Sequence, residues 1–312
     1  MATRDTTVGA QPGAIRLRAE GTRWGEVAVK GVLAFCALVS VATTVGIVIA
    51  LLLPSIEFFR EVSIVDFFTD DRWAPLFEPA SYGVRPLLAG TFTVTFWASL
   101  VALPFGLGAA VYLSEYASPR ARGILKPALE VLAGIPTVVF GFFALTFFTP
   151  LLQDLGLDVG TFNVLSAGIV IGVLLIPTVA SISEDAMAAV PQELRDGAYG
   201  LGASKLQVST RIVIPAAVSG IVASFVLAIS RAVGETMVVL LAAGGIAQLT
   251  LDPREPSQTM TAFIGATGIG DVPTGSIEYK TIFAVGLTLF VITLFMNMVS
   301  IRLVRKYREV YE

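Results

Sequence analysis

The stretch VLAFCALVSVATTVGIVIALLL, residues 32–53, contains no charged residue. A helix of about 20 apolar residues is long enough to cross the hydrocarbon core of a bilayer. Comparable runs recur along the chain, which has 312 residues, 55% of them hydrophobic and only 14% charged. Soluble domains carry about 25% charged residues, and helices that are apolar on every side belong in a membrane or a large core. The sequence therefore predicts an all-α, multi-pass protein of the cell membrane.

Six apolar runs are long enough to be membrane spans. The first is longer than the core of a signal peptide, which is about 7–15 residues, so we expect it to be retained. The spans together define a predicted transmembrane domain over 32–303, with polar cytoplasmic tails over 1–31 and 304–312. The predicted spans are about 32–53, 87–114, 128–152, 163–183, 216–244 and 281–301.

Lysine and arginine residues are unevenly distributed between the two sides of these spans. The N-terminal tail, the residues after 301 and the connections 115–127 and 184–215 hold 15 of the 21, whereas the other connections hold five. Positive charge accumulates in cytoplasmic loops, so both termini are predicted to be cytoplasmic, as an even number of spans requires. The long connections at about 54–86 and 245–280 then lie outside, either as a docking surface for an extracytoplasmic partner or as a linker capping the bundle.

The composition excludes several kinds of chemistry. The chain has no histidine and one cysteine, Cys36, which excludes His/Cys zinc sites, catalytic sets that need histidine, and an intrachain disulfide. No G-x-x-x-x-G-K-[ST] run is present, so we do not expect this chain to bind ATP. The net charge of −3, without a basic patch, gives no indication of nucleic acid. We therefore do not expect this chain to be an enzyme, or to hold a metal or a cofactor of its own.

The connection 184–215, EDAMAAVPQELRDGAYGLGASKLQVSTRIVIP, carries a spaced pattern of small residues. Asp196, Gly197 and Ala198 are followed, after three residues, by Gly202. Small side chains let the surface of another protein approach the backbone closely, which is the functional interpretation of this pattern. An amphipathic surface helix with chance spacing is the alternative.

This pattern resembles the coupling loop of ATP-binding-cassette (ABC) importer permeases: Glu-Ala-Ala, three residues, Gly, nine residues, Ile, any residue, Leu, Pro. Here aspartate replaces the glutamate, glycine the first alanine, and isoleucine the leucine. The resemblance implies that the connection folds as a helix that sits in a cleft of a separate ATPase subunit. The implied coupling residues are Asp196, Gly197, Ala198, Gly202, Ile212 and Pro215.

Two charged residues, Arg231 and Glu235, interrupt the predicted fifth span. An arginine at a helix centre costs about 2.5–3.5 kcal/mol on insertion scales, so it is expected to face protein or a water-filled path. In a continuous helix the four-residue spacing puts both on one face, where each partly neutralises the other. Arg231 is predicted to attract an oxyanion, because guanidinium suits phosphate or carboxylate; a structural ion pair is the alternative. Thr137 and Thr178, each directly after a proline, are weaker candidates for the substrate path.

The stretches SRAVGETM (230–237), LAGIPTVVFG (132–141) and YGVRPLLAGTFTVT (82–95) resemble permease subunits of the Pst-type phosphate importer, of the PstC type rather than the PstA type. The resemblance covers roughly 30–310 and implies the type I importer fold and a transport role for Arg231 and Glu235. It also implies three kinds of partner: a second, PstA-type permease subunit, two ATPase subunits that use ATP, and an extracytoplasmic phosphate-binding protein. The expected function is thus that of the permease of an ATP-driven phosphate importer. A permease for molybdate, sulfate or phosphonate, or an ion-coupled secondary transporter, is the alternative.

Overall fold

The computed structural model of the chain describes residues 24–307, so the parts of the predicted tails at 1–23 and 308–312 lie outside the described residues. The chain divides into two compact units, residues 1–49 and 50–312. Helix α1 (Trp24–Glu61) begins in the first unit and ends in the second. It starts before the predicted span and continues through Pro54, where we had expected the span to stop.

The predicted fold class, an all-α membrane protein, is confirmed. The described residues contain five helices that are long and apolar enough to cross a membrane. A sixth span results if the helices over 205–216 and 218–233, which meet at 70°, count as one broken span. The orientation with both termini inside stays a prediction. In the described residues the sheet consists of two short antiparallel strands, β1 (Trp73–Ala74) and β2 (Ser81–Tyr82).

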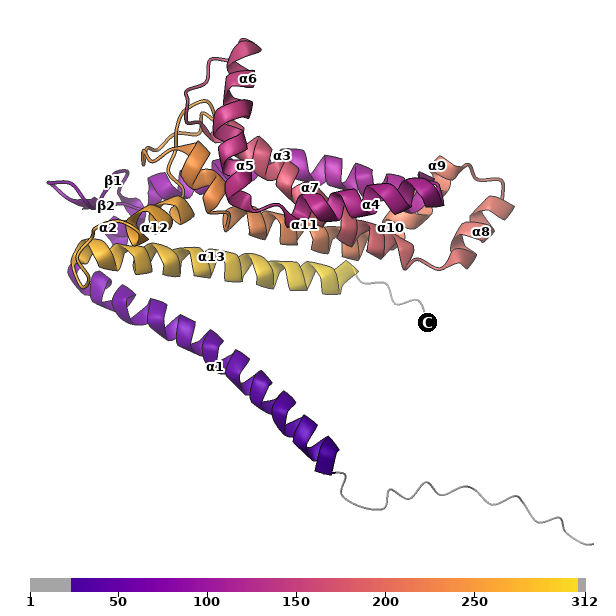
Figure 1. The fold of residues 1–312 in the computed structure, drawn as a ribbon, viewed down its shortest axis with the longest axis horizontal. Coiled ribbons are helices and arrows are strands. Elements are labelled where there is room, and N and C mark those ends of the chain that lie inside the picture. Colours follow the sequence, from indigo (N-terminus) through magenta and orange to yellow (C-terminus); the bar gives the residue numbers. More distant parts are fainter. Residues whose placement is uncertain (1–23, 308–312) are drawn as a thin grey trace, which may run out of the picture. The chain divides into compact units, whose positions relative to one another are not determined.

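Helices α3 (Arg85–Val111) and α7 (Val164–Ala188) pack against each other and form the centre of the second unit, with α11 (Val218–Val233) beside them (Figure 1). A Cβ added at Gly172 would lie 2.6 Å from Val101 Cβ and 2.8 Å from the Ala98 carbonyl oxygen. The α7 backbone therefore approaches α3 more closely than any side chain would allow. This confirms the close helix packing that small residues favour in membrane bundles.

The predicted third span over 128–152 is not one helix. Helix α4 (Pro119–Gly134) ends before Pro136, and a new helix begins at Thr137. Ile135 is extended, with φ −68° and ψ 130°, as expected for a residue that precedes proline. The new helix runs to Asp154 through a π-helical turn; its parts are α5 (Thr137–Phe143), η2 (Ala144–Phe148) and α6 (Thr149–Asp154).

The predicted fifth span over 216–244 is also broken. Helix α11 ends at Val233, residues 234–236 are not helical, and helix resumes before the π-helical turn η4 (Val239–Ala243). Glycine at position 234 weakens a helix by about 1 kcal/mol relative to alanine, which helps to place the break there.

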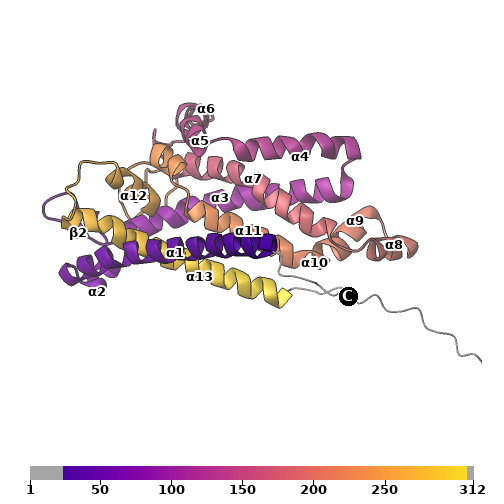
Figure 2. The same ribbon diagram turned by 60° about the horizontal axis from the view of Figure 1, so that its bottom comes forward.

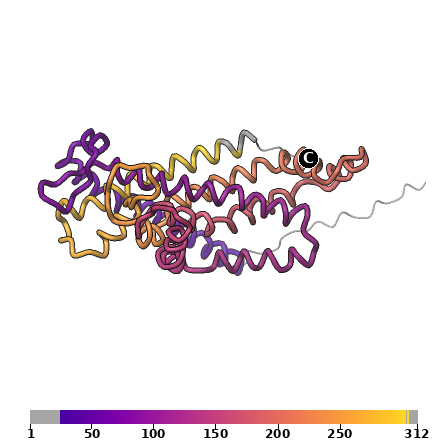
Figure 3. Tube along the Cα trace, turned by 90° about the horizontal axis from the view of Figure 1, so that it is seen from above, coloured from indigo at the N-terminus to yellow at the C-terminus, as the bar shows by residue number. Residues whose placement is uncertain are grey.

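The connections of the second unit gather at opposite ends of its bundle (Figure 1 and Figure 3). The connection 184–215, called the coupling connection below, was predicted to lie on the opposite side of the bundle from the two long connections at about 54–86 and 245–280, and this arrangement agrees with that prediction. At one end are the end of α3, η1 (Tyr112–Tyr116), and the coupling connection with α8 (Gln192–Gly200), α9 (Lys205–Val208), η3 (Ser209–Val213) and α10 (Ile214–Ala216). At the other end are α2 (Ile64–Thr69), the two strands, α12 (Met260–Gly268) and the start of α13 (Ile277–Tyr307).

The two long connections, at about 54–86 and 245–280, pack on each other. Phe58, Phe67 and Trp73 from the first form one buried apolar cluster with Met260 and Phe263 from the second. The connections therefore form a folded cap over this end of the bundle, which agrees with the capping alternative. Their role as a docking surface stays a prediction.

We predict that Gly172→Ala lowers the stability of the folded protein, because the added methyl group would collide with α3. Overpacking of this kind costs about 1–3 kcal/mol. The matched control is Gly108→Ala in α3, where an added Cβ meets nothing within 4 Å. The measurement is the midpoint of thermal unfolding of each variant, purified in the same detergent. Equal midpoints for the two variants would contradict the close approach of α3 and α7.

Candidate substrate path and coupling surface

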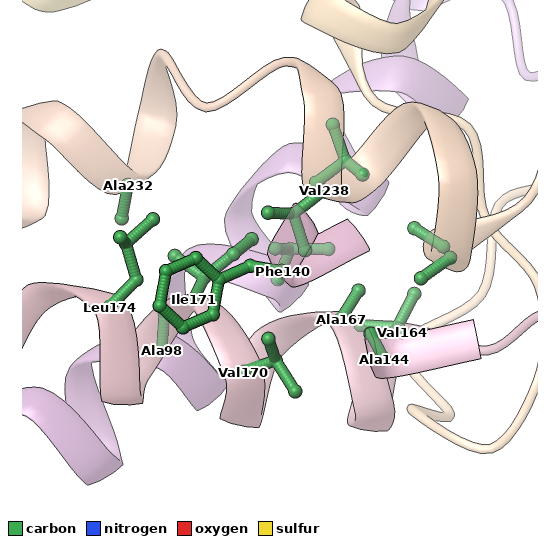
Figure 4. Packing of buried hydrophobic residues seen from close by; sticks show 14 of the residues in the cluster. Ala98, Phe140, Ala144, Val164, Ala167, Val170, Ile171, Leu174, Ala232 and Val238 are labelled. Atoms are coloured by element: carbon green, nitrogen blue, oxygen red, sulfur yellow. The ribbon is translucent and has the colours of Figure 1, made fainter. Parts of the chain in front are cut away.

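The two helix breaks meet at the centre of the bundle. Phe140 of α5 lies against Ile171 and Leu174 of α7, with Ala232 of α11 and Val238 close by (Figure 4). The residues directly after the first break and those on both sides of the second therefore share one apolar cluster. Broken helices are tolerated at membrane depth where protein covers them or where they line a cavity.

Arg231 lies in the last turn of α11, next to the second break. Its Nη1 donates a hydrogen bond to the Thr178 hydroxyl, 3.2 Å away. Thr178 follows Pro177 within α7, so the structure brings together two of the four predicted substrate-path residues. The guanidinium is exposed, and among the side chains that the structure describes no carboxylate forms an ion pair with it. Its remaining N–H donors are thus open to a ligand.

Glu235 does not pair with Arg231, contrary to the prediction. One of its carboxylate oxygens accepts hydrogen bonds from the backbone N–H groups of Thr236 and Met237, both at 3.1 Å, and of Val238, at 3.4 Å. The predicted same-face pairing required a continuous helix, and the break at Gly234 removes it. The carboxylate instead caps the helix that resumes after the break, where a negative charge is favourable.

Thr137 is the first residue of α5, directly after the first break. In the described part of the chain no hydrogen bond joins it to Arg231 or to Thr178. Its neighbour one turn later, Phe140, reaches the apolar cluster at the second break. The structure thus places Thr137 near this region without bringing it into the polar contact, and its role stays a prediction.

A cavity of about 260 Å³ lies between α4 and α7, which run side by side (Figure 2). Thr178 and Ser181 line it from α7, and Lys126 and Glu130 line it from α4. Because Thr178 also contacts Arg231, the cavity extends the polar region from the break toward the C-terminal end of α7.

Glu184 closes the far end of this cavity and is fully buried. It pairs with Arg122, and it accepts a hydrogen bond of 2.7 Å from the Lys126 ammonium, which also reaches Asp185 at 3.3 Å. The hydrogen bond to Glu184 raises the pKa of Lys126, with a smaller contribution from Asp185, so the ammonium stays charged at neutral pH. Glu184 and Asp185 therefore pair with cations from the first half of α4. The ion pairs join α4 to α7.

The coupling connection presents an open surface around α8. Asp196 is exposed and accepts a hydrogen bond of 3.0 Å from the Gln192 amide. A Cβ added at Gly197 would meet nothing within 4 Å, as expected for a surface that another protein can approach closely. Ala198 lies on the opposite face and packs into the apolar cluster at this end of the bundle. Further along, Ile212 is half-buried and Pro215 is exposed.

Gly202 has a conformational role that the sequence pattern did not reveal. Its φ of +82° lies in the left-handed region that favours glycine. The following N–H, of Ala203, donates to the Ala198 carbonyl oxygen at 3.1 Å, which closes the end of α8 in the manner of a glycine-terminated helix. Gly202 therefore sets the turn between α8 and α9.

Two further residues of this region were missed by sequence reasoning. Arg195 of α8 and Glu115 of η1 form an ion pair, although 80 positions separate them along the chain. No spacing pattern links two residues so far apart. The one signal in the sequence was the position of Glu115, a carboxylate directly after the predicted span 87–114.

A bundle of apolar helices, with a helical connection exposed at one end and an arginine beside a helix break that has no carboxylate partner among the described side chains, is typical of a membrane transport subunit. The sequence profile of the family described as "Binding-protein-dependent transport system inner membrane component" matches residues 102–309. The chain belongs to this family and is therefore a multi-pass, non-catalytic subunit of the inner membrane.

Several curated relatives align over most of the chain. It is 34% identical to the "Probable ABC transporter permease protein YqgH" of Bacillus subtilis (strain 168), over 91% of this chain and 92% of that protein. It is 29% identical to the "Phosphate transport system permease protein PstC" of Haemophilus influenzae, over 92% of this chain and 95% of that one. It is 34% identical to "Phosphate transport system permease protein PstC 1" of Mycobacterium bovis, over 73% of each.

Two solved structures show the same fold. A bacterial alginate ABC transporter matches 91% of this chain and 97% of its own, with a TM-score of 0.62 and 15% identity. The inward-facing MetNI methionine ABC transporter matches 73% of this chain and 95% of its own, with a TM-score of 0.54 and 18% identity. These likenesses confirm the type I importer permease fold.

We predict opposite effects of one substitution at two glycines of the coupling connection. Gly202→Ala places a side chain at positive φ and lowers stability by more than about 1 kcal/mol. Gly197→Ala lies in open space within a helix and raises stability by up to about 1 kcal/mol. The midpoints of thermal unfolding of the two purified variants provide the measurement. A midpoint for Gly202→Ala at or above that of the unaltered chain would contradict the assigned turn.

Proposed function

We propose that this chain is the permease subunit of an ATP-driven importer of inorganic phosphate. The observation that carries the proposal is Arg231: an exposed guanidinium, bonded to Thr178, without a carboxylate partner among the described side chains. A charge of this kind is costly within a membrane unless a ligand or water-filled path faces it. Guanidinium and hydroxyl donors together suit a phosphate oxyanion. Relatives named as phosphate transport permeases support phosphate as that oxyanion.

The proposed complex contains further subunits. ATP is hydrolysed by two separate ATPase subunits, one of which receives the coupling connection in its cleft through the exposed face of α8. A second, PstA-type permease completes the path across the membrane. An extracytoplasmic phosphate-binding protein docks on the cap formed by the two outer connections, which together line a cavity of about 670 Å³.

In this mechanism the loaded binding protein delivers phosphate to the outer end of the bundle. Closure of the ATPase subunits moves the coupling connection, and the bundle changes from outward to inward access. Phosphate passes Arg231 and Thr178, whose N–H and O–H groups replace part of its hydration. Glu235 keeps the break next to Arg231 open by capping the following helix.

We predict that restoring this gene to a host that lacks it restores uptake of radiolabelled phosphate. The uptake is expected to stop when ATP is depleted, to survive a protonophore at constant ATP, and to be insensitive to excess sulfate or molybdate. If the chain is present in the membrane but phosphate uptake is unchanged, phosphate is not the substrate. Uptake that follows the proton gradient at constant ATP would instead indicate a secondary transporter.

We further predict that Arg231→Gln lowers phosphate uptake at an unchanged amount of chain in the membrane. Loss of one hydrogen bond to a charged group costs about 1.5–3 kcal/mol. This corresponds to roughly a ten- to hundredfold fall in apparent affinity. Thr178→Val, which keeps the side-chain shape but removes the hydroxyl, should give a smaller fall. The control is Arg120→Gln, an exposed arginine of the cytoplasmic connection. Equal uptake by Arg231→Gln and the control would contradict a role for Arg231 in the path.

A further inference from the structure

Arg195 is the one basic residue of helix α8, and its side chain points into the protein, with 11% of its surface exposed. The guanidinium donates to three acceptors. Nη1 bonds to the Val190 carbonyl oxygen at 2.6 Å, and Nη2 bonds to the Met187 carbonyl oxygen at 2.8 Å and to Glu115 Oε1 at 3.2 Å. A planar fork can serve all three at once, which an ammonium group cannot do in the same geometry.

The three acceptors belong to two different parts of the bundle. Met187 lies in the last turn of α7, and Val190 is the second residue after the end of that helix. Glu115, with 6% of its side chain exposed, lies in the π-helical turn that ends α3, where it also accepts a hydrogen bond of 3.0 Å from Ser114. Arg195 thus fastens α8 to the ends of both helices that form the centre of the bundle.

The backbone offers no comparable connection. Pro191 separates α8 from α7, and Gly202 turns the chain sharply at the other end of α8. Neither join is continuous helix, so a force on α8 is not carried into the spans by a rigid rod. Besides Arg195, α8 is attached mainly through Ala198 in an apolar cluster, which is a contact without directional bonds.

The face of α8 opposite Arg195 is exposed, with Glu193, Gly197 and Gly200. A partner that pushes or pulls this face therefore acts on a helix that is held from behind by one buried guanidinium. Helix α7, the main structure behind it, carries Thr178, which bonds to Arg231. A continuous set of contacts runs from the exposed face of α8 to the arginine at the helix break.

We propose that Arg195 is a positioning residue for energy coupling, which makes α8 move as one body with α7 and the end of α3. Movement of the ATPase subunits then reaches Thr178 and Arg231 instead of being lost in rotation of α8 about Pro191 and Gly202. This inference rests on the proposed function, because it requires an ATP-driven importer.

The test measures two rates in the same preparation. The complex is purified from its native host through a tag on this chain and reconstituted in liposomes, and phosphate transport and ATP hydrolysis are both followed. Arg195→Lys keeps the positive charge but removes the planar guanidinium that donates to all three acceptors. In the double variant Arg195→Gln/Glu115→Gln no buried charge is left unpaired, so this variant is expected to fold even where a single change fails. Arg120→Gln is the matched control.

We expect both Arg195 variants to assemble with the ATPase and to hydrolyse ATP at rates near that of the unaltered complex. The amount of phosphate carried per ATP should fall roughly five- to thirtyfold, the size of effect expected for residues that couple two sites. The control should keep the original ratio. An unchanged ratio in the assembled variants would overturn the inference, and so would loss of ATPase assembly in the double variant, which would show a role in docking. Absence of phosphate transport in the unaltered complex would instead refute the proposed function.

Discussion

Within the hydrocarbon core of a bilayer there is no water to bond with backbone N–H and C=O groups, so the chain must satisfy them itself. Continuous helices do this over most of each span in the second unit. The two interruptions, at Ile135–Pro136 and at residues 234–236, need other partners. At the second, the Glu235 carboxylate takes the N–H groups that the break frees. At the first, proline has no N–H to satisfy, and the Val139 N–H bonds to the Pro136 carbonyl oxygen at 3.0 Å.

These breaks explain where the chemistry of the bundle lies. A helix that ends inside the bundle can present a long side chain from its last turn, as α11 presents Arg231. The same side chain in the middle of an unbroken, lipid-facing helix would have no polar surroundings. Glu235 contributes by holding the break in place, so its charge acts on the backbone rather than on its neighbour in sequence. The two charged residues therefore have different tasks, although one motif contains both.

The sequence predicted the class of fold, the number of apolar runs and the surface that α8 exposes, because each depends on composition or on spacing within one segment. The breaks were not predictable in the same way. Pro54, Pro104 and Pro177 all lie inside continuous helices, whereas Pro136 ends one, so proline alone does not decide the matter. What differs is the surroundings: Phe140, one turn after Pro136, is held in the central apolar cluster. The pairing predicted for Arg231 and Glu235 failed because the helix breaks at Gly234. Four-residue spacing brings two side chains to one face only within an unbroken helix.

The second unit combines two kinds of attachment, and their difference bears on how it can move. Helices α3 and α7 are joined by close backbone contact at glycines, which leaves no room for relative sliding without repacking. Helix α4 is instead joined to α7 by ion pairs of Arg122 and Lys126 with Glu184, whereas α8 is fastened to both helices by the three hydrogen bonds of the Arg195 guanidinium. Interdigitated packing has few alternative arrangements, whereas the long, partly exposed side chains of Arg122 and Lys126 can follow Glu184 through a change in the angle of α4. We therefore expect α3 and α7 to behave as the rigid centre during transport. Thr178, the proposed substrate contact, and Met187, the proposed coupling contact, then belong to the same rigid helix, so the movement proposed for the ATPase subunits would have a direct route to the proposed substrate path.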